Sequence, residues 1–408
     1  MLRLQAATVL VAGFVSTSAW AEEKPLPDGP GKATVQALCA GCHEMERSTN
    51  ANYTAQEWKT VIDMMVNFGV PIPKNEIETV ANYFIKNYPE RPKPTAVVVP
   101  GPAEVAFKEW QVPTPGSRPH DPLATPDGAI WYTGQMANVL GRLDPKTGQI
   151  KEYPVKRPQS GPHGLVNDRD GNIWFTANAA TYIGRLDPKT GAVTEYPMPD
   201  AKVRDPHTLL FDANGILWFT AQNGNAVGRL DPASGGIQTW FMPSPRSRPY
   251  GMVINSKGTV FFDEFGAPKI ASIDPETTAI TEYQLPDAGS RPRRIAITSD
   301  DVIWYTDFAL GRLGRLDTKT GKVTEYASPS GAKSQPYGIS VVKDVIWYSE
   351  SGTRPNTLVR FDPKTEKFQT WIIPSGGGVV RNMVTMPDGN LALACSAVNG
   401  LALVEIKK

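Results

Sequence analysis

The sequence contains few cysteines, few histidines and no long apolar run after its first residues. Its 408 residues include only 3 Cys and 4 His, so a disulfide framework does not hold this chain together. Lys and Arg number 42 and Asp and Glu number 41, which gives a net charge of +1. This balance excludes a strongly basic face, so we expect no nucleic-acid partner.

Glycine and proline, by contrast, are abundant. There are 36 Gly and 37 Pro, a composition typical of a chain with many tight turns and β structure. Hydrophobic residues make up 40% of the chain and aromatic residues 9%, which is enough for a large core and excludes wholesale disorder. At about 100–200 residues per domain, the length predicts two or three domains.

The first 21 residues have the pattern of a cleaved secretory signal. Arg3 precedes an apolar stretch at residues 6–15, and a small-residue A-x-A ending closes at Ala21. Such a stretch is too short to span a bilayer. The alternative is an uncleaved anchor. We expect a periplasmic protein with no transmembrane segment after signal cleavage.

Residues 24–90 predict a small helical domain. Thr54 and Glu57 fit a capping box, in which side chains satisfy free backbone N–H groups at a helix start. Apolar residues then recur at helical spacing up to Gly69, and a second such run ends at Pro89. Residues 91–106 are rich in proline and predict a stiff, extended linker.

Residues 39–43 read Cys-Ala-Gly-Cys-His. In an exported protein this spacing predicts one covalent haem c, with Cys39 and Cys42 bonded to its vinyl groups and His43 as the proximal iron ligand. The alternatives are a Cys39–Cys42 disulfide or a zinc site, although no second cysteine pair is present to complete the latter.

Met64 and Met65 are the candidates for the sixth iron ligand, because Met45 is too near His43 to reach the opposite haem face. Residues 31–90 resemble small single-haem c-type cytochrome domains with a W-x6-M-x3-G pattern, here Trp58, Met65 and Gly69. The resemblance implies Met65 as the ligand, with Met64 as its competitor. Alternatively, both methionines line a haem pocket.

From residue 107 to 408 the chain repeats a phrase of the type DGxIWYT, GRLDPKTG and TEYxxP every 42–45 residues. Aligned on the aromatic residue after each turn, the repeats number seven, and the seventh is degenerate. Four short alternating segments per repeat predict a seven-bladed β-propeller, so the fold class is a small α domain followed by an all-β domain. The segment beginning near Phe107 precedes any first strand and should complete the last blade.

The phrases RPHD, GPHG and DPHT, each followed by IWYT, IWFT or LWFT and then GRLDP, resemble those of virginiamycin B lyase and its streptogramin-lyase relatives. The resemblance covers residues 107–408 and implies a seven-bladed propeller. It also implies C–O lyase activity from a PH histidine paired with a carboxylate in the WFTE position of the same blade, plus a histidine of a neighbouring blade.

Two sets of equivalent positions predict a functional channel mouth. At the start of each first strand stand His120, His163, His207, Tyr250, Arg293, Tyr337 and Arg381. After each second strand stand Gly134, Ala177, Ala221, Glu264, Asp307, Glu350 and Cys395. The histidine blades carry small residues in the second set, which breaks the lyase pairing and counts against antibiotic linearisation.

We therefore expect His120, His163 and His207 to face the carboxylates of Glu264, Asp307 and Glu350 across a small cavity. Such a site could bind a divalent or transition metal or act as general bases. The alternative is that the histidines only satisfy backbone groups in a wet channel.

Three functions follow from this organisation. The first is an oxidoreductase or electron-transfer protein, in which the propeller binds a substrate or metal and haem passes electrons to an acceptor such as another periplasmic cytochrome. The second is a streptogramin-lyase-like C–O lyase with an appended cytochrome. The third is a non-catalytic propeller that docks a redox partner.

Overall fold

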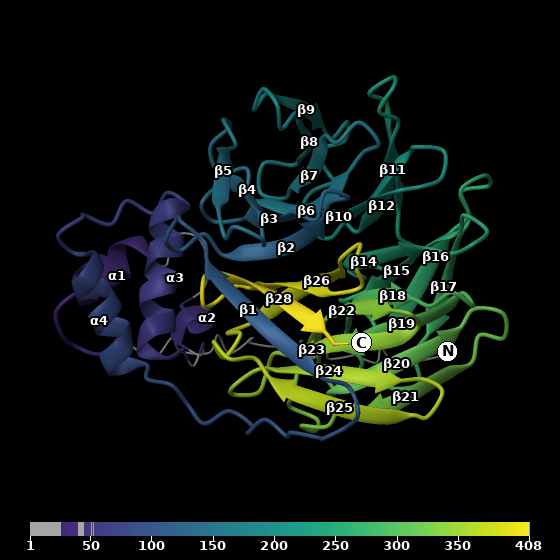
Figure 1. Cartoon of the computed structure of the whole chain (residues 1–408). Helices are drawn as coiled ribbons and strands as arrows, with labels where there is room; N and C mark the ends of the chain where they lie inside the picture. The colour runs from purple at the N-terminus through teal and green to yellow at the C-terminus, as the bar shows by residue number, and fades with distance from the viewer. Residues whose placement is uncertain (1–25, 40–44, 50, 52, 408) are drawn as a thin grey trace, which may run out of the picture.

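The computed structural model describes residues 26–39, 45–49, 51 and 53–407. The expected signal segment, Cys42 and His43 lie outside the described residues. Within the described part, no helix is both long enough and apolar enough to cross a membrane. Figure 1 shows a group of helices beside a ring of β-sheets.

The helical module, residues 26–90, contains α1 (Lys32–Leu38), α2 (Glu46–Thr49), α3 (Ala55–Asn67) and α4 (Ile77–Asn87). The predicted capping box is present at the start of α3: Glu57 N donates to Thr54 Oγ1 and Thr54 N donates to Glu57 Oε2. Trp58 of α3 stacks on Phe84 of α4, with ring centroids 4.6 Å apart. The module thus has a small core of its own.

Seven four-stranded antiparallel sheets confirm the predicted seven-bladed propeller. The first three complete blades are β2 (Pro119–Ala124), β3 (Ile130–Gly134), β4 (Val139–Leu143) and β5 (Ile150–Pro154); β6 (Pro162–Asn167), β7 (Ile173–Ala177), β8 (Tyr182–Leu186) and β9 (Val193–Pro197); and β10 (Pro206–Phe211), β11 (Leu217–Ala221), β12 (Ala226–Leu230) and β13 (Ile237–Phe241).

The next three blades are β14 (Pro249–Ile254), β15 (Val260–Glu264), β16 (Lys269–Ile273) and β17 (Ile280–Gln284); β18 (Pro292–Ile297), β19 (Val302–Asp307), β20 (Arg312–Asp317) and β21 (Val323–Ala327); and β22 (Pro336–Val342), β23 (Val345–Glu350), β24 (Thr357–Asp362) and β25 (Lys367–Ile372). The seventh blade contains β26 (Val380–Thr385), β27 (Leu391–Cys395) and β28 (Gly400–Ile406).

The seventh blade is completed from the other end of the propeller sequence. Strand β1 (Val105–Gln111) pairs antiparallel with β28, so that Phe107 lies opposite Val404. This pairing confirms the predicted closure, although β1 begins at Val105 rather than 107. It joins the first and last segments of the ring and leaves no open gap between blades.

The repeated GRL phrase has a steric origin. A Cβ at Gly141 would lie 2.0 Å from the ring of Tyr132, and one at Gly184 would lie 2.2 Å from the ring of Phe175. The aromatic side chain of the second strand therefore lies directly on the glycine of the third strand. This close packing explains why a glycine recurs in each of these blades.

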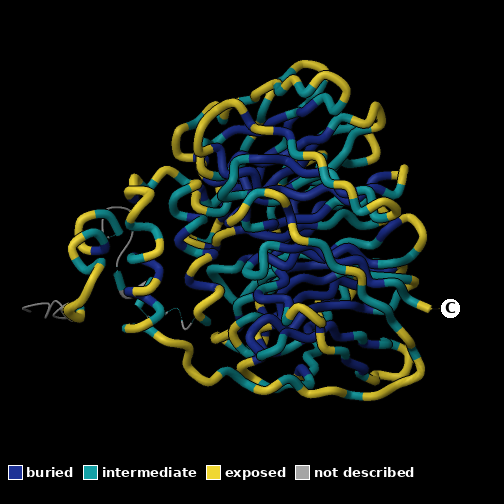
Figure 2. Tube along the Cα trace, turned by 60° about the vertical axis from the view of Figure 1, so that its left-hand side comes forward, coloured by how far each residue is buried: buried dark blue, intermediate teal, exposed yellow. Residues whose placement is uncertain are grey.

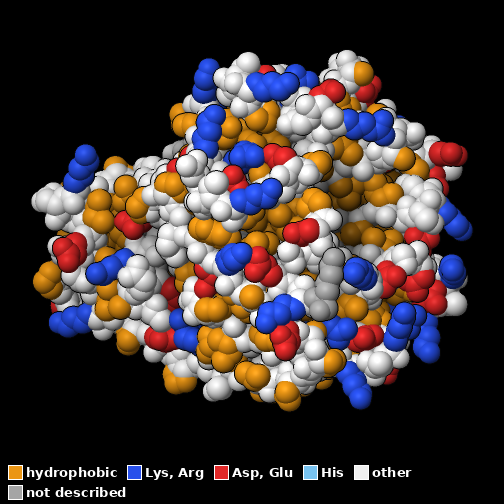
Figure 3. Space-filling model, in the orientation of Figure 1, with side chains coloured by type: hydrophobic (Ala, Val, Ile, Leu, Met, Phe, Trp, Pro, Cys, Tyr) orange, Lys and Arg blue, Asp and Glu red, His pale blue; other side chains and the backbone are white. Residues whose placement is uncertain are grey.

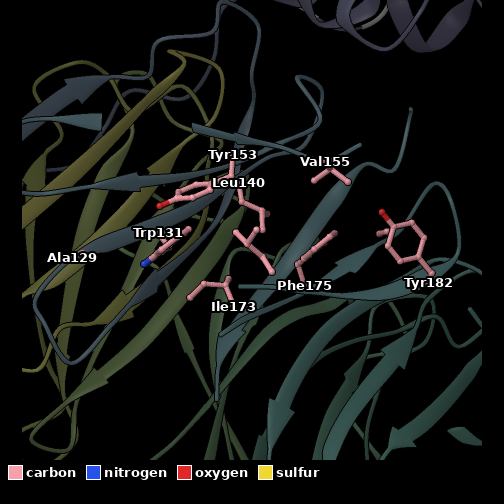
Figure 4. Packing of buried hydrophobic residues seen from close by; sticks show 10 residues of the cluster. Ala129, Trp131, Leu140, Tyr153, Val155, Ile173, Phe175 and Tyr182 are labelled. Carbon is pink, nitrogen blue, oxygen red and sulfur yellow. The ribbon is translucent and has the colours of Figure 1, made fainter. Parts of the chain in front are cut away.

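The core lies between neighbouring blades. Trp131, Leu140 and Tyr153 of the first complete blade pack near Ile173 and Phe175 of the next, as Figure 4 shows. Figure 2 shows buried residues running through the blades and exposed ones along the peripheral turns. Each blade buries one face on each neighbour, so a separate apolar cluster fills each interface between blades.

The proline-rich segment is docked on the propeller rather than extended away from it. Thr95 forms an isolated bridge with Arg354, Val99 N donates to Thr370 Oγ1 at 2.7 Å, and Gln369 Nε2 donates to the carbonyl of Ala103. The segment therefore follows the outer strand β25 and brings the chain back to β1 (Figure 1).

Candidate functional site

The three histidines predicted from the repeat lie side by side. His120, His163 and His207 are each the second residue of a strand, β2, β6 and β10, after a proline. Their ring centroids are 3.7 Å apart between His120 and His163, and 3.8 Å apart between His163 and His207. The ring of Tyr250 continues this row, 3.8 Å from His207. We call these four residues the imidazole row.

An irregularity in each inner strand frees these residues from the sheet ladder. The register between β2 and β3 shifts between Pro119 and Pro122, and the β6–β7 register shifts between Pro162 and Leu165. The residues that are skipped, His120 among them, are unpaired with the second strand, as at a β-bulge. The amides there bond to threonine side chains instead: Asp121 N donates to Thr133 Oγ1 at 3.1 Å and Gly164 N to Thr176 Oγ1 at 2.8 Å.

The threonine of each IWYT or IWFT phrase fixes the next blade's row residue. Thr133 Oγ1 donates to the carbonyl of His163 at 2.8 Å, and Thr176 Oγ1 donates to that of His207 at 2.8 Å. These threonines are fully buried. The repeated threonine therefore positions the row across the blade boundary, a role that the sequence analysis missed.

A buried ion pair joins the row to the opposite side of the channel. Asp121 Oδ1 lies 2.8 Å from His120 Nδ1 and accepts from Arg294 Nη2 at 2.5 Å. Both Asp121 and Arg294 are buried, with side chains 5% and 4% exposed. No local pattern in the sequence points to this pair, because its two residues stand 173 positions apart.

The imidazoles are held in the neutral form. Burial lowers the pKa of His120, His163 and His207 well below the usual value. The charges of Arg381 and Arg118 lower the pKa of His120 further. His163 Nδ1 has no hydrogen-bond partner among the described residues. A neutral imidazole has a lone pair available to accept a proton or bind a metal.

Two tyrosines and an arginine form the other end of the channel site. Tyr250 Oη and Tyr337 Oη lie 2.6 Å apart. The guanidinium of Arg293 lies 3.9 Å from the centroid of the Tyr337 ring and 4.2 Å from that of Phe308. Burial opposes ionisation of Tyr337, but the charges of Arg293, Arg381 and Arg294 lower its pKa below the ordinary value.

His120, Asp121 and His163 present ligand atoms within 4.8 Å of one another. Two imidazoles and a carboxylate are a donor set that suits several transition metals. The same carboxylate oxygen, however, already accepts from Arg294. A dication would lie close to that guanidinium, so the surrounding charge favours an anion more than a cation.

The structure does not pair the three predicted carboxylates with the histidines by any hydrogen bond among the described residues. Asp307 accepts from the backbone N–H groups of Arg291 and Ala309 at 3.0 and 3.1 Å. Glu350 accepts from Ser330 N at 2.8 Å and from Thr357 Oγ1 at 2.6 Å. Both carboxylates therefore hold loops at the end of their blades.

Glu264 is the carboxylate without such contacts. Its side chain is buried and neither oxygen has a hydrogen-bond partner among the described residues. Burial and the neighbouring Glu282 raise its pKa to about 8. A group in this state is a proton donor at neutral pH.

The side chains at the end of each second strand lie against the loop that enters the same blade. At the equivalent place in the first complete blade, a Cβ on Gly134 would lie 2.3 Å from Ser117 Oγ. Side chains here meet the loop that enters the same blade, whereas the imidazole row lies beside the channel. Asp307 and Glu350 accept hydrogen bonds from such loops, and none among the described residues joins them to the histidines.

An open pocket of about 1,050 Å³ is lined by loops of the blades that begin with β6, β10, β14 and β18. Phe265 lines it together with four arginines, Arg204, Arg246, Arg248 and Arg291. Phe265 connects this pocket to the channel site, because its ring lies 5.6 Å from that of Tyr250 and 4.8 Å from the Arg293 guanidinium. Acidic and basic side chains are otherwise interspersed on the face in Figure 3.

A second cavity, of about 320 Å³, lies between the helical module and the propeller. Cys39, Met64 and Met65 line it from the helices, and Arg118 and Arg381 line it from the propeller. The structure thus brings three of the residues predicted for haem binding to one cavity. The other two, Cys42 and His43, lie outside the described residues.

Comparison with known proteins identifies the propeller. The sequence model of the virginiamycin B lyase family matches residues 101–354, and the chain belongs to this family. A streptogramin B lyase structure shares 28% sequence identity with a TM-score of 0.68, covering 74% of this chain and 98% of that one. Virginiamycin B lyase from Staphylococcus aureus shares 26% identity with a TM-score of 0.67, covering 74% of this chain and 99% of that one.

More distant structures share only the fold. Hydrazine synthase from Kuenenia stuttgartiensis is 15% identical with a TM-score of 0.59, covering 72% of this chain and 96% of that one. The comparison with curated proteins found no match. The family membership therefore rests on the propeller.

Proposed function

We propose that the propeller is a lyase-type enzyme that removes a proton from a small organic anion bound at the channel mouth. The observation that carries this proposal is the row of three neutral imidazoles bordered by arginines. Neutral imidazoles accept protons, and guanidinium groups stabilise the negative charge that develops when a proton leaves a carbon next to a carbonyl group.

The proposed reaction is an elimination. His207 takes the proton from the carbon next to the substrate carboxylate, because it adjoins Tyr250 and through it the open pocket. The electron pair forms the new C=C bond as the neighbouring C–O bond breaks, and the oxygen leaves as a carboxylate. The carboxylate leaving group needs no proton, so His207 keeps the proton that it has taken until the products leave.

The substrate class follows from the pocket. The resemblance to streptogramin lyases implies a histidine and a carboxylate in one blade, but here the row residue in the blade of Glu264 is Tyr250. Four arginines line the open pocket, and guanidinium groups bind carboxylates in bidentate geometry. We therefore expect a substrate with a carboxylate and a β-acyloxy leaving group.

The test uses N-acetyl-O-acetylthreonine as the probe, with quinupristin in parallel. Elimination from the probe releases acetate and an unsaturated acid, both measurable by liquid chromatography and mass spectrometry. We expect turnover of the probe and a loss of at least about 100-fold in kcat for His207→Ala. Arg169→Leu, a change at an exposed arginine, is the matched control. Turnover of neither compound would reject the proposal.

We also propose a haem c in the helical module, with electron transfer to a periplasmic acceptor as a second function. The cavity that Cys39, Met64 and Met65 line supports this proposal, as does the Cys-Ala-Gly-Cys-His sequence. Its helical wall includes Trp58 and Phe84, which suits the apolar face of a porphyrin. A bound haem would supply a one-electron redox centre.

The haem proposal has a direct test. Haem that stays with the denatured protein in acidified solvent would support thioether attachment, and released or absent haem would reject it. Methionine ligation gives a weak near-infrared band near roughly 700 nm in the ferric state. We expect Met65→Ala to abolish that band and Met64→Ala to keep it. The reverse result would assign Met64.

A further inference from the structure

The cavity between the helical module and the propeller has two chemically different walls. On the helical side it is lined by apolar and thioether groups, among them Leu38, Trp58 and Met65. On the propeller side it is lined by Arg118 and Arg381, with small and apolar neighbours. A ligand that fills it must therefore be apolar at one end and anionic at the other.

The acidic residue that lines this cavity, Glu57, has its hydrogen bonds elsewhere. Glu57 is bound instead by its own helix start, where Thr54 N donates to it at 2.8 Å. It is also bound by Arg354, whose Nη2 lies 2.8 Å from Glu57 Oε2. Arg381 Nε is buried and has no hydrogen-bond partner among the described residues. A buried guanidinium N–H without a partner is costly and favours binding of an acceptor.

We infer that Arg118 and Arg381 of the propeller bind the carboxylates of the cofactor held by the helical module, so that the two modules form one composite cofactor site. This inference rests on the proposed haem, whose two propionates provide the carboxylates. Arginine suits this role, because its planar fork of donors matches a carboxylate.

The composite site connects the cofactor to the channel. Arg381 belongs to the same set of strand-start positions as the imidazole row, and both arginines act electrostatically on His120. Carboxylates bound there offset the positive charge that faces His120. Occupancy of the cofactor site and protonation of His120 are therefore linked through Arg118 and Arg381.

The test compares full-length protein with Arg381→Leu, Arg381→Lys and the control Arg169→Leu. Arg169 is exposed and donates to the carbonyl of Ala213, in a loop that does not line the cavity. The readouts are the covalent haem content and the haem midpoint potential. Removing a positive charge near the iron stabilises the ferric state, so the potential should fall.

We expect equal haem content in all four proteins, a lower potential in Arg381→Leu, a smaller change in Arg381→Lys and none in Arg169→Leu. An unchanged potential in Arg381→Leu with full haem content would overturn this inference while leaving the haem proposal intact. Absence of covalent haem from the unmodified protein would reject the haem proposal and this inference together.

Discussion

At the scale of single residues, the most consequential contact is the buried pair of Asp121 and Arg294. Asp121 follows His120 in the phrase RPHD, but Arg294 lies outside the repeated phrases that predicted the histidines. The pair places one carboxylate beside His120 and joins it to Arg294 in a buried, hydrogen-bonded charge pair. A buried charge is tolerated only when it is paired in this way.

Breaking this pair should therefore destabilise the propeller strongly. We expect Arg294→Leu to lower the free energy of unfolding by about 3–5 kcal/mol, because it leaves Asp121 buried without its cation. Urea denaturation measures the change. The double variant Asp121→Asn/Arg294→Leu should recover part of the loss, whereas equal losses in the single and double variants would show that shape, not charge, decides the cost.

Glu264 gives a prediction for pH. Its pKa of about 8 in the folded protein lies above the ordinary value of 4.5, so the folded state holds the proton where the unfolded state has lost it. Between these two values stability falls as pH rises. The Glu264→Gln variant lacks this penalty.

We expect the free energy of unfolding of Glu264→Gln to rise by about 1–3 kcal/mol relative to that of the unmodified protein when pH rises from about 5 to about 8.5. The buried histidines act in both proteins and cancel in the comparison. Urea denaturation at both pH values measures the gain. A constant difference between the two proteins would mean that Glu264 is ionised throughout.

At the scale of elements, closure of the ring depends on β1. Its residues pair with β28 over the full length from Val105 to Gln111, although nearly three hundred residues separate the paired positions. Such a strand gains its stability from its partner and from burial rather than from local sequence. Val404, which pairs with Phe107, is fully buried.

Hydrogen–deuterium exchange tests this element. The amides of β1 should exchange as slowly as those of β5, an outer strand formed within a single repeat, because each is paired with the third strand of its blade. Val404→Ala should cost about 1–3 kcal/mol and speed exchange in β1 before β5. Exchange in β1 as fast as in the proline-rich segment would contradict this closure.

At the scale of the whole molecule, the helical module is fastened to one end of the propeller. Arg354 of the propeller lies 2.8 Å from Glu57 and 2.6 Å from Glu90 of the module. Asn67 Nδ2 also donates to the carbonyl of Pro115 at 2.7 Å. Polar contacts of this kind fix orientation more than they add stability.

Arg354→Ala should loosen the module without unfolding either part. We expect faster proteolysis within residues 91–104, since the bridge between Thr95 and residue 354 weakens as well. Limited thermolysin digestion followed by mass spectrometry measures the cleavage, because this protease cuts before apolar residues such as Val97–Val99. Arg360→Ala, which removes an ion pair within one strand, is the control and should leave the cleavage rate unchanged.

The sequence alone determined the seven blades, the closing strand, the capping box of α3 and the placement of three histidines in one row. These features depend on short-range spacing, because each blade forms from neighbouring segments and repeats the same geometry. The tertiary structure alone decided the Asp121–Arg294 pair, the contacts of Asp307 and Glu350, and the two-walled cavity. Each of these joins residues far apart in the chain. Their meeting depends on how blades and modules pack, and no local pattern of the sequence encodes that packing.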